Sequence, residues 1–500
     1  MGRSCGVIAA ISSLPSPYGI GTIGAAARSF VNFLAQAGQS WWQVLPVGPT
    51  SYGDSPYQSP SSFAGNPYLI DLDQLIEEGL LDKEEVTAIG WGSDPERVDY
   101  GVLFRERLPL LRRAYRRGWR RDQTEVAAFA QEHASWLDDY ALFMALKQHF
   151  GMTAWTQWPD EEARLRTSEA LTRYRVELAD DIRCHTYLQY LFFKQWDALR
   201  AHAHGRGVRI IGDMPIYVAL DSADAWADPQ WFQLDEDNLP TRVAGVPPDY
   251  FNADGQLWGN PLYDYDAMRS DGFGWWVRRM GGIASLYDMV RLDHFRGFES
   301  YWSVPAGERT AKHGRWVKGP GMELVGALLG SFPQLSFIAE DLGYVTPEVA
   351  RLLEDSGLPG MKVLELAFDS REATSYLPHL YDRHCVCYTG THDNAPIMGW
   401  RGEAAPADVQ TAIDYLGLNS DEGFNWGVIR GGMASVADLF MAQIQDYLGL
   451  GSASRMNTPG YVGGNWQWRL TEGQLTDQLA MRMAKMVRLY GRKEGSSWQR

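Results

Sequence analysis

Short apolar runs that end in Gly, Asp or Pro recur along the 500-residue chain. Runs of this kind are typical of strands in a parallel sheet, which are covered on both faces. Amphipathic helical patterns, such as AAARSFVNFLAQAG and TPEVARLLEDSG, lie between most of them. The alternation predicts the α/β class, and about eight repeats favour a closed (β/α)8 TIM barrel with helical insertions. The runs are CGVIAAI, WWQVLPV, VRIIGDMPIYV, MVRLDHF, LSFIAEDLG, MKVLELAF and CVCYTGTHDN.

The connection between the second and third runs, residues 66–204, is long and mostly helical in pattern. We interpret it as a helical insertion subdomain on a single catalytic barrel that spans residues 1–500, with a separate all-helical domain as the alternative. Its RRAYRRGWRR stretch is basic. In an acidic chain, such a stretch indicates a solvated helix face more often than a nucleic-acid patch.

The charge balance limits the classes of partner, because the formal net charge is -16 at pH 7. It argues against a protein that binds nucleic acid without sequence preference, and against one that binds anionic membranes, since both rely on clustered Lys and Arg. We find no apolar run long enough to span a membrane. A neutral ligand is fully compatible with this charge.

The four cysteines are Cys5, Cys184, Cys385 and Cys387, and we predict reduced thiols in the core rather than disulfides or metal ligands. Only Cys385 and Cys387 are close in sequence, where both would point to one face of a strand. The opening MGRSCGVIAAISSLP imitates a signal peptide, but its apolar part is brief. The sequence therefore predicts a cytoplasmic protein.

Aromatic side chains make up 13% of the chain, and many of its 20 Trp and 24 Tyr residues lie in segments rich in Gly, Pro and Asn. Core packing explains most of them. The others suit a sugar-binding surface, because pyranose rings present apolar C–H faces that stack on flat side chains with polar edges.

Three acidic residues stand at the ends of buried strand patterns. Asp293 lies in MVRLDHF, Glu340 in SFIAED and Asp393 in CYTGTHDN. A carboxylate beside an apolar core is unfavourable unless it is paired or used. In a (β/α)8 barrel all three would lie at the C-terminal face, where such barrels carry their chemistry.

Asp293 and Glu340 fit the pair of carboxyl groups that retaining glycosidases and transglycosidases use. One attacks the anomeric carbon and the other protonates the leaving oxygen, at a separation of about 5–5.5 Å. The alternative for Asp293 is a salt bridge with Arg291 or Arg296, which is compatible with the catalytic role because a guanidinium favours the ionised nucleophile. The alternative for Glu340 is a surface carboxylate beside Asp341. An ionised Asp293 nearby would raise the pKa of Glu340, as a general acid requires.

Asp393 follows His392 in a Gly-Thr-His-Asp loop, where the pair could bind adjacent hydroxyls of one sugar ring. A His-Asp pair also occurs in metal sites and catalytic triads, but neither a nucleophile elbow nor a metal-binding motif accompanies it. Asp213, in RIIGDMPIYV, is a fourth acid at a strand end. It could bind a sugar hydroxyl or anchor Arg291, and the sequence ranks neither first.

Several longer stretches occur in a fixed order: GDSPYQSPSSFAGNPYLI, IGDMPIYVALDSADAWA, GVPPDYFNADGQLWGNPLYDY, RLDHFRGF, IAEDLG, YTGTHDN, and RMNTPG with GNWQWR. With these stretches the chain resembles the 4-α-glucanotransferases known as amylomaltase or disproportionating enzyme. They form glycoside hydrolase family 77 and are relatives of the α-amylases. The resemblance covers the chain nearly end to end, so it is far more specific than any single motif.

The resemblance implies transfer between α-1,4-glucans, with maltooligosaccharides and starch- or glycogen-type glucans as substrates and glucose as an acceptor. It implies that Asp293 is the nucleophile, Glu340 the acid/base and Asp393 the transition-state stabiliser. The residues that the resemblance places at the sugar subsites are Ser55, Tyr57, Asp213, Gln256, Trp258, Arg291, His392 and Asn465. The sequence has no EF-hand-like acidic loop and no GxGxxG after a strand, so we expect no metal or organic cofactor. We also expect a monomer or weak dimer that binds neither nucleic acid nor membrane.

Segment 245–260 resembles the family's mobile active-site loop, with Tyr250 and Phe251 at its tip. Tyr52 resembles an aromatic residue that in some members holds glucan at a second site. The Pro pair and the Gly residues of the segment suit a loop with fixed ends and a flexible crown.

Two positions depart from the family pattern. Ala395 follows THDN where an acid is usual, and Leu366 lies in LELAFD where an aromatic residue is common. Neither departure touches the three acids.

Two other functions are compatible with the residues: an α-amylase-like hydrolase with the same carboxylates, and a catalytically silent glucan-binding protein. Transfer requires that the acceptor is held and water is excluded, which an aromatic loop over the site can provide. The intact set of three acids favours an enzyme.

Overall fold

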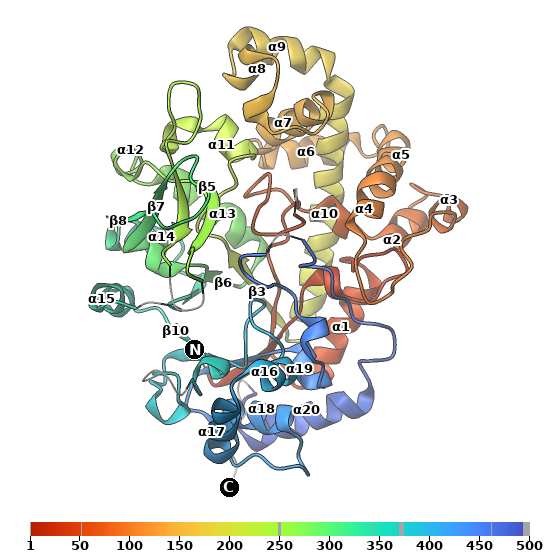
Figure 1. Cartoon of the computed structure of the whole chain (residues 1–500). Helices are drawn as coiled ribbons and strands as arrows, with labels where there is room; N and C mark the ends of the chain where they lie inside the picture. The colour runs from red at the N-terminus through yellow and green to blue at the C-terminus, as the bar shows by residue number, and fades with distance from the viewer. Residues whose placement is uncertain are drawn as a thin grey trace.

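Eight parallel strands close into a barrel, which confirms the predicted (β/α)8 fold class (Figure 1). The strand order around the barrel is β1, β2, β3, β6, β9, β10, β11 and β12, and β12 pairs with β1. The computed structural model describes residues 2–51, 53–248, 252–343, 345–369, 375–461 and 463–493. The barrel strands are β1 (Ser4–Ile8), β2 (Trp41–Gln43), β3 (Arg209–Met214), β6 (Met289–Leu292), β9 (Ser336–Ala339), β10 (Gly360–Val363), β11 (Cys385–Tyr388) and β12 (Leu439–Gln443).

Alternate residues of these strands build two apolar layers. Ile211 and Met289 lie in the core inside the barrel, whereas their neighbours Ile210 and Val290 lie in the larger core between barrel and helices. Because both faces of each strand are covered, the strands read in the sequence as continuous apolar runs. Seven of the eight strands coincide with runs that the sequence analysis identified, and β12 was missed.

Helices follow most barrel strands and pack on the outside of the barrel (Figure 1). α15 shows how local sequence sets a helix start: the Thr346 side chain accepts a hydrogen bond from the Val349 N–H, and Pro347 occupies the first turn. The helices outside the long insertion are α1 (Ala25–Gln36), α11 (Ala223–Ala227), α12 (Tyr265–Ser270), α13 (Gly274–Leu286), α14 (Met322–Ser331), α15 (Pro347–Ser356), α16 (Ile397–Glu403), α17 (Pro406–Leu416), α18 (Phe424–Ala434), α19 (Ile444–Leu448) and α20 (Asp477–Leu489).

Among the residues that the structure describes, nine α-helices lie between β2 and β3, in the segment interpreted as an insertion. The long helix α10 packs against α1 and β3, and residues of this segment share one apolar core with the barrel. The description of residues 66–204 as an insertion subdomain stays a prediction. The helices are α2 (Leu72–Glu77), α3 (Lys83–Thr87), α4 (Tyr100–Val102), α5 (Leu108–Gly118), α6 (Gln123–Glu132), α7 (Leu137–His149), α8 (Glu161–Arg164), α9 (Ser168–Glu177) and α10 (Ala179–Gly205).

The basic stretch RRAYRRGWRR lies mostly in α5, and several of its arginines are paired with acids. Arg117, for example, lies 2.6 Å from Glu85 and 3.0 Å from Asp82. Partner acids on neighbouring segments reduce the positive potential that a nucleic-acid patch requires.

A four-stranded antiparallel sheet flanks the barrel, and the sequence analysis did not predict it. Its strands are inserted in the connections that follow β3 and β6. The predicted loop 245–260 spans the end of β4, a turn and most of β5, while Tyr250 and Phe251 lie outside the described residues. The order is β5 (Gln256–Pro261), β4 (Arg242–Val246), β7 (Ser300–Pro305) and β8 (Arg315–Lys318).

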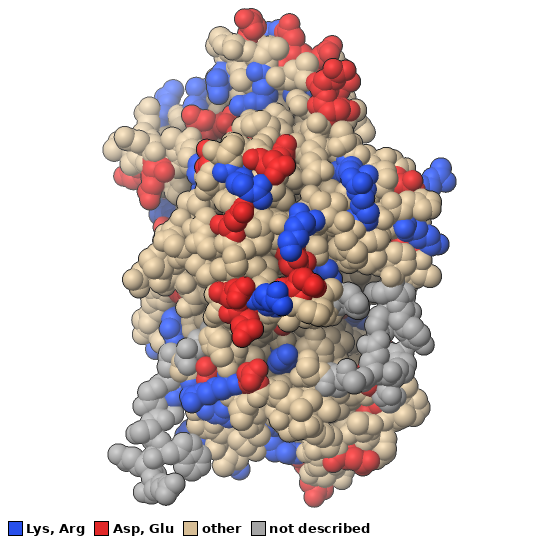
Figure 2. Space-filling model, turned by 90° about the vertical axis from the view of Figure 1, so that its left-hand side faces the viewer, with Lys and Arg blue, Asp and Glu red and all other residues tan. Residues whose placement is uncertain are grey.

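The exterior face in Figure 2 carries Lys and Arg interspersed with Asp and Glu. Within the described ranges, no helix, including the 27-residue α10, has the length and apolar character required to cross a bilayer. The four cysteines are buried free thiols, as predicted.

Candidate active site

A polar layer closes the C-terminal end of the barrel interior. Ile211, Met289 and Ile338 point into the barrel and are fully buried. Because side chains alternate along a strand, the residues two positions further on also point inward. The strands β3, β6 and β9 are neighbours, so these polar residues gather at one place. They are Asp213, Arg291 and Glu340.

Arg291 joins two carboxylates at this end of the barrel. Its Nη1 donates to both oxygens of Asp213, at 2.8 Å each, and to Oδ1 of Asp293 at 2.7 Å. Burial by itself would lower the pKa of Arg291, but the carboxylates raise it well above its usual value. Asp213 therefore anchors Arg291, and of the two arginines considered from the sequence it is Arg291, not Arg296, that is found paired with Asp293.

Glu340 is 8% exposed, which rules out the alternative of a surface carboxylate. Its Oε2 accepts from the His294 N–H at 2.7 Å, and its Oε1 accepts from the Leu342 N–H at 2.9 Å. Burial raises the pKa of Glu340 to about 8, and the charge of Asp293 adds to this effect, whereas Arg291 and the two N–H groups oppose it. At neutral pH Glu340 is therefore mostly protonated, as a general acid must be.

His294 connects Glu340 to the antiparallel sheet. Its backbone is left-handed, with φ 51°, an uncommon conformation for a residue other than glycine. The His294 ring meets the Trp258 ring edge to face, with centroids 4.9 Å apart, and burial lowers the pKa of His294 to about 4. Trp258 Nε1 in turn donates to Gln256 Oε1 at 3.2 Å. Trp258 on β5 thus contacts the residue whose backbone N–H donates to Glu340.

Asp393 is held by a loop that lies near the C-terminal end of the chain. Its Oδ1 accepts from Asn457 Nδ2 at 2.6 Å and lies 3.4 Å from His392 Nε2. Arg455 Nη2 donates to the Asp393 carbonyl at 2.5 Å. The Asp393 side chain is still 39% exposed, so it is accessible to a ligand from one side.

Tyr57 links the loop after β2 to the two sets of acids. Its hydroxyl donates to Asp213 Oδ2 at 2.9 Å and lies 3.4 Å from His392 Nδ1. The Tyr57 ring stacks on the His392 ring at 5.0 Å and lies 5.6 Å from the Trp466 ring. Ser55 Oγ accepts from the Tyr57 N–H at 3.2 Å. Burial keeps the pKa of Tyr57 well above its usual value, so its hydroxyl remains a donor.

Not every predicted residue joins this network. The Asn465 side chain accepts from the Thr458 N–H at 3.0 Å and donates to a carbonyl of the same loop at 3.0 Å, so it stabilises that loop. Tyr52, Tyr250 and Phe251 lie outside the described residues.

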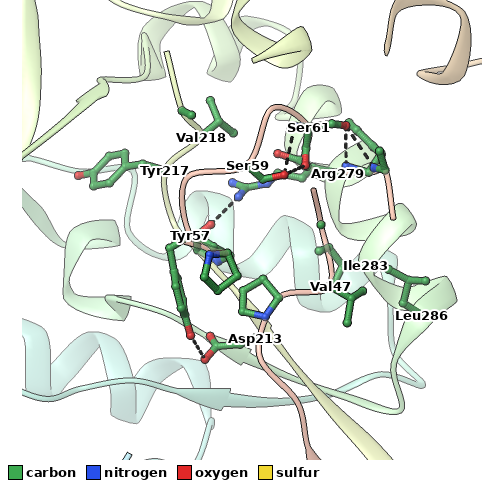
Figure 3. A pocket seen from close by; sticks show the side chains of 18 of the residues that line it. Val47, Tyr57, Ser59, Ser61, Asp213, Tyr217, Val218, Arg279, Ile283 and Leu286 are labelled. Carbon is green, nitrogen blue, oxygen red and sulfur yellow. Dashed lines mark hydrogen bonds between the residues drawn. The ribbon is translucent and has the colours of Figure 1, made fainter. Parts of the chain in front are cut away.

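A cavity of about 50 Å³ lies behind Tyr57 and Asp213. Figure 3 shows these two residues joined at one end of it, with Ser61 toward the other end and Ile283 along its wall. Ligand pockets usually measure about 300–1,000 Å³, so this cavity is too small to be a sugar subsite. It separates the Tyr57 loop from α13, which carries Ile283.

The carboxylates of the site are paired with nitrogen donors rather than grouped around one point. Among the residues that the structure describes, no three His, Cys, Asp or Glu side chains are arranged to hold a metal ion. Asp293 binds Arg291, Glu340 binds backbone N–H groups, and Asp393 binds Asn457.

The sequence analysis missed several residues of this site. Asn457 and Arg455 hold Asp393, Trp466 extends the Tyr57–His392 stack, and His294 donates to Glu340. Asn457 and Arg455 lie in RMNTPG, and Trp466 in GNWQWR, so the stretches were noted without a role for these residues.

Comparison with known proteins gives a consistent result over the whole chain. The family model described as 4-alpha-glucanotransferase matches residues 9–476. The chain is 46% identical to a 4-alpha-glucanotransferase of Clostridium butyricum, over 97% of this chain and 100% of the relative. It is 48% identical to that of Thermus thermophilus, over 97% and 98%. The structure of an amylomaltase from Streptococcus agalactiae in complex with acarbose matches with a TM-score of 0.96 and 42% identity, covering 98% of this chain and 99% of that one. The chain therefore belongs to the 4-α-glucanotransferase family.

Proposed function

We propose that this 4-α-glucanotransferase transfers α-1,4-glucan segments by a retaining double displacement at Asp293, Glu340 and Asp393. The observation that carries the proposal is the joint arrangement of Asp293 and Glu340. Asp293 is bound to a permanently charged Arg291, while burial raises the pKa of Glu340 to about 8. The guanidinium beside Asp293 suits a nucleophile, and the raised pKa of Glu340 suits a proton donor, which is the division of roles that retaining enzymes require.

In the first step, Asp293 attacks the anomeric carbon of the donor glucan. Arg291 binds Oδ1, and the other carboxylate oxygen forms the new bond. The bond between the anomeric carbon and the glycosidic oxygen breaks, and Glu340 transfers its proton to that oxygen as the shortened chain leaves. The product is a covalent glucosyl ester on Asp293.

In the second step, the ionised Glu340 accepts the proton of the 4-hydroxyl of an acceptor glucan or glucose. The acceptor oxygen attacks the anomeric carbon and the ester bond to Asp293 breaks. Two inversions restore the α configuration, and Glu340 regains its proton for the next cycle.

Asp393 and His392 stabilise the transition state of both steps. Positive charge develops on the sugar ring there, and a carboxylate fixed in place beforehand stabilises it without reorganisation. The bond from Asn457 supports this role, because it fixes the Asp393 carboxylate while leaving the side chain 39% exposed.

The substrates that we propose are maltooligosaccharides and starch- or glycogen-type glucans, with glucose as an acceptor. The name of the matching family and the aromatic side chains Tyr57, Trp258 and Trp466 at the site support this choice. Tyr250 and Phe251, which lie outside the described residues, are proposed as further aromatic contacts for sugar.

We further propose that the enzyme works in the cytoplasm as a monomer or weak dimer. Its four cysteines are buried free thiols, which suits a reducing compartment. Light scattering of the purified protein at several concentrations measures the oligomeric state directly.

Incubation with maltotriose distinguishes transfer from hydrolysis. We expect glucose together with maltotetraose and longer oligomers, while the number of reducing ends stays constant, because each transfer breaks one glycosidic bond and forms another. Chromatography of the products and a reducing-end assay measure both quantities. Glucose and maltose as the only products, with rising reducing ends, would show the α-amylase-like hydrolase instead.

The pH dependence tests the role of Glu340. With maltotriose as donor, kcat/KM should fall as the pH rises through about 8, because Glu340 then loses the proton that the leaving chain needs. With α-maltosyl fluoride, whose leaving group needs no protonation, this alkaline limb should disappear. Glu340→Gln should lower kcat/KM for maltotriose by about 10²–10⁴-fold and change it little for the fluoride. An equal loss with both donors would contradict the assignment.

A further inference from the structure

The loop from Thr389 to Ile397 carries both His392 and Asp393. It runs from the end of β11 to the first residue of α16 and has no regular secondary structure of its own. Its internal hydrogen bonds are local: the Asn394 side chain accepts from Thr391, and the Asn394 N–H donates to the Thr391 carbonyl at 3.1 Å. Bonds to neighbouring elements must therefore set the position of the loop as a whole.

One buried carboxylate binds both ends of this loop. Asp446 Oδ2 accepts from the Thr389 hydroxyl at 2.5 Å, and Asp446 Oδ1 accepts from the Ile397 N–H at 2.7 Å. The Asp446 side chain is 0% exposed and lies in α19, directly after β12. Figure 1 shows α19 adjacent to α16, which Ile397 begins. A single side chain thus bridges residues on either side of His392 and Asp393.

The segment that carries Asp446 makes a third hydrogen bond to the loop, and another side chain holds the segment in place. Gln443, the last residue of β12, donates from Nε2 to the Ala395 carbonyl at 3.3 Å. Asn425 donates to the Asp446 carbonyl at 2.7 Å, which fixes the backbone of Asp446. The loop is therefore fastened to the barrel strand β12 and its extension α19.

Asp446 carries a negative charge among the buried polar groups that hold the loop. Burial raises its pKa to about 6, while the Thr389 hydroxyl and two backbone N–H groups act in the opposite direction, so it is mostly ionised at neutral pH. The pKa of the nearby Glu365 lies well above its usual value. Burial and the charges of Asp446 and Glu403 raise this pKa, whereas the charge of Arg455 acts in the opposite direction. These effects favour the neutral form of Glu365, which reduces repulsion between Glu365 and Asp446.

The buried polar groups that hold the loop also pack closely against it. A Cβ atom on Gly390 would lie 3.0 Å from Glu365 Oε1 and 3.1 Å from both Asn394 Cβ and Gln443 Nε2. Glycine at position 390 thus lets the loop approach the polar groups below it. This contact leaves little room for the loop to shift while the bonds to Asp446 are intact.

We propose that Asp446 is a positioning residue that sets the place of the Asp393 carboxylate by holding both ends of the loop from Thr389 to Ile397. The inference rests on the proposed role of Asp393 as transition-state stabiliser. Asp446 does not touch the sugar in this proposal. Asp446 contributes to the rate by preventing misplacement of Asp393, because a shift of about 1 Å at a reacting group can lower a rate by about 10²-fold.

Thr389 offers a matched pair of variants for the test. Thr389→Val keeps the shape of the side chain but removes the hydroxyl that binds Asp446, whereas Thr389→Ser keeps the hydroxyl. With α-maltosyl fluoride as donor, so that proton transfer from Glu340 does not limit the rate, we expect Thr389→Val to lower kcat by about 10- to 100-fold. KM should change much less, and Thr389→Ser should restore most of the rate. An unchanged kcat in Thr389→Val would overturn the proposal.

A double-mutant cycle separates positioning from a general loss of stability. In an Asp393→Asn background, Thr389→Val should lower the rate little further, because the group that it misplaces is already inactive. The same loss in both backgrounds would show that the effect does not pass through Asp393, which also overturns the proposal. If Thr389→Val does not fold, Asp446→Asn, which keeps one acceptor oxygen, replaces it in the same double-mutant cycle with Asp393→Asn. A wild-type rate in Asp393→Asn itself would instead contradict the proposed function.

Discussion

Asp293→Asn is expected to abolish transfer almost completely, with kcat lower by about 10⁴–10⁶-fold on maltotriose. The amide cannot form the glucosyl ester, and loss of a catalytic nucleophile typically has an effect of this size. The fold should persist, because Arg291 keeps its two bonds to Asp213. Product formation over long incubations, measured beside the thermal midpoint, tests both statements. Unchanged turnover would show that Asp293 is not the nucleophile.

The stereochemistry of azide products gives an independent control for the two acids. Asp293→Gly with α-maltosyl fluoride and azide should yield the β-azide, because azide attacks the face from which the nucleophile is missing. Glu340→Ala should yield the α-azide, because azide then attacks the covalent intermediate from the opposite face. The reverse pattern would exchange the roles of the two residues.

Arg291→Met is expected to have the largest effect on stability, about 3–5 kcal/mol of unfolding free energy. The variant leaves Asp213, 1% exposed, without the guanidinium that donates to both of its oxygens. It also frees the Asp293 carboxylate, so transfer should fall by at least about 10²-fold. Urea unfolding and maltotriose turnover measure the two effects. A stability equal to that of the parent protein would contradict the role of Arg291 as the centre of this charge cluster.

The loss of stability in Arg291→Met should depend on pH in a defined direction. Burial already raises the pKa of Asp213, and removal of Arg291 raises it further. A carboxyl group with a raised pKa in the folded state stabilises the fold when it is protonated, and this stabilisation is lost as the pH rises. The loss of unfolding free energy in Arg291→Met should therefore be smaller at pH 5 than at pH 7.5. The double variant Asp213→Asn with Arg291→Met, which removes the buried charge, should recover part of the stability at pH 7.5.

The direction of a side chain on a strand follows from a period of two. The apolar residues Ile211 and Met289 point into the barrel, so Asp213 and Arg291 had to do the same. Strand β12 was missed for a related reason. Its residues LFMAQ continue without a turn signal into the helical IQDYL, and an apolar run of this kind fits a helix as well as a strand.

The sequence by itself determined the fold class and predicted which acids stand at strand ends, because both depend on patterns within short segments. Only the tertiary structure decided how those acids are held. Asn457 binds Asp393 from 64 positions away, and Asp446 binds Thr389 from 57 positions away. Asp446 lies in α19, directly after the strand β12 that the pattern did not reveal. The raised pKa of Glu340 likewise comes from burial and from the charge of Asp293 on a neighbouring strand. Such properties depend on distances through space between segments, which local periodicity does not encode.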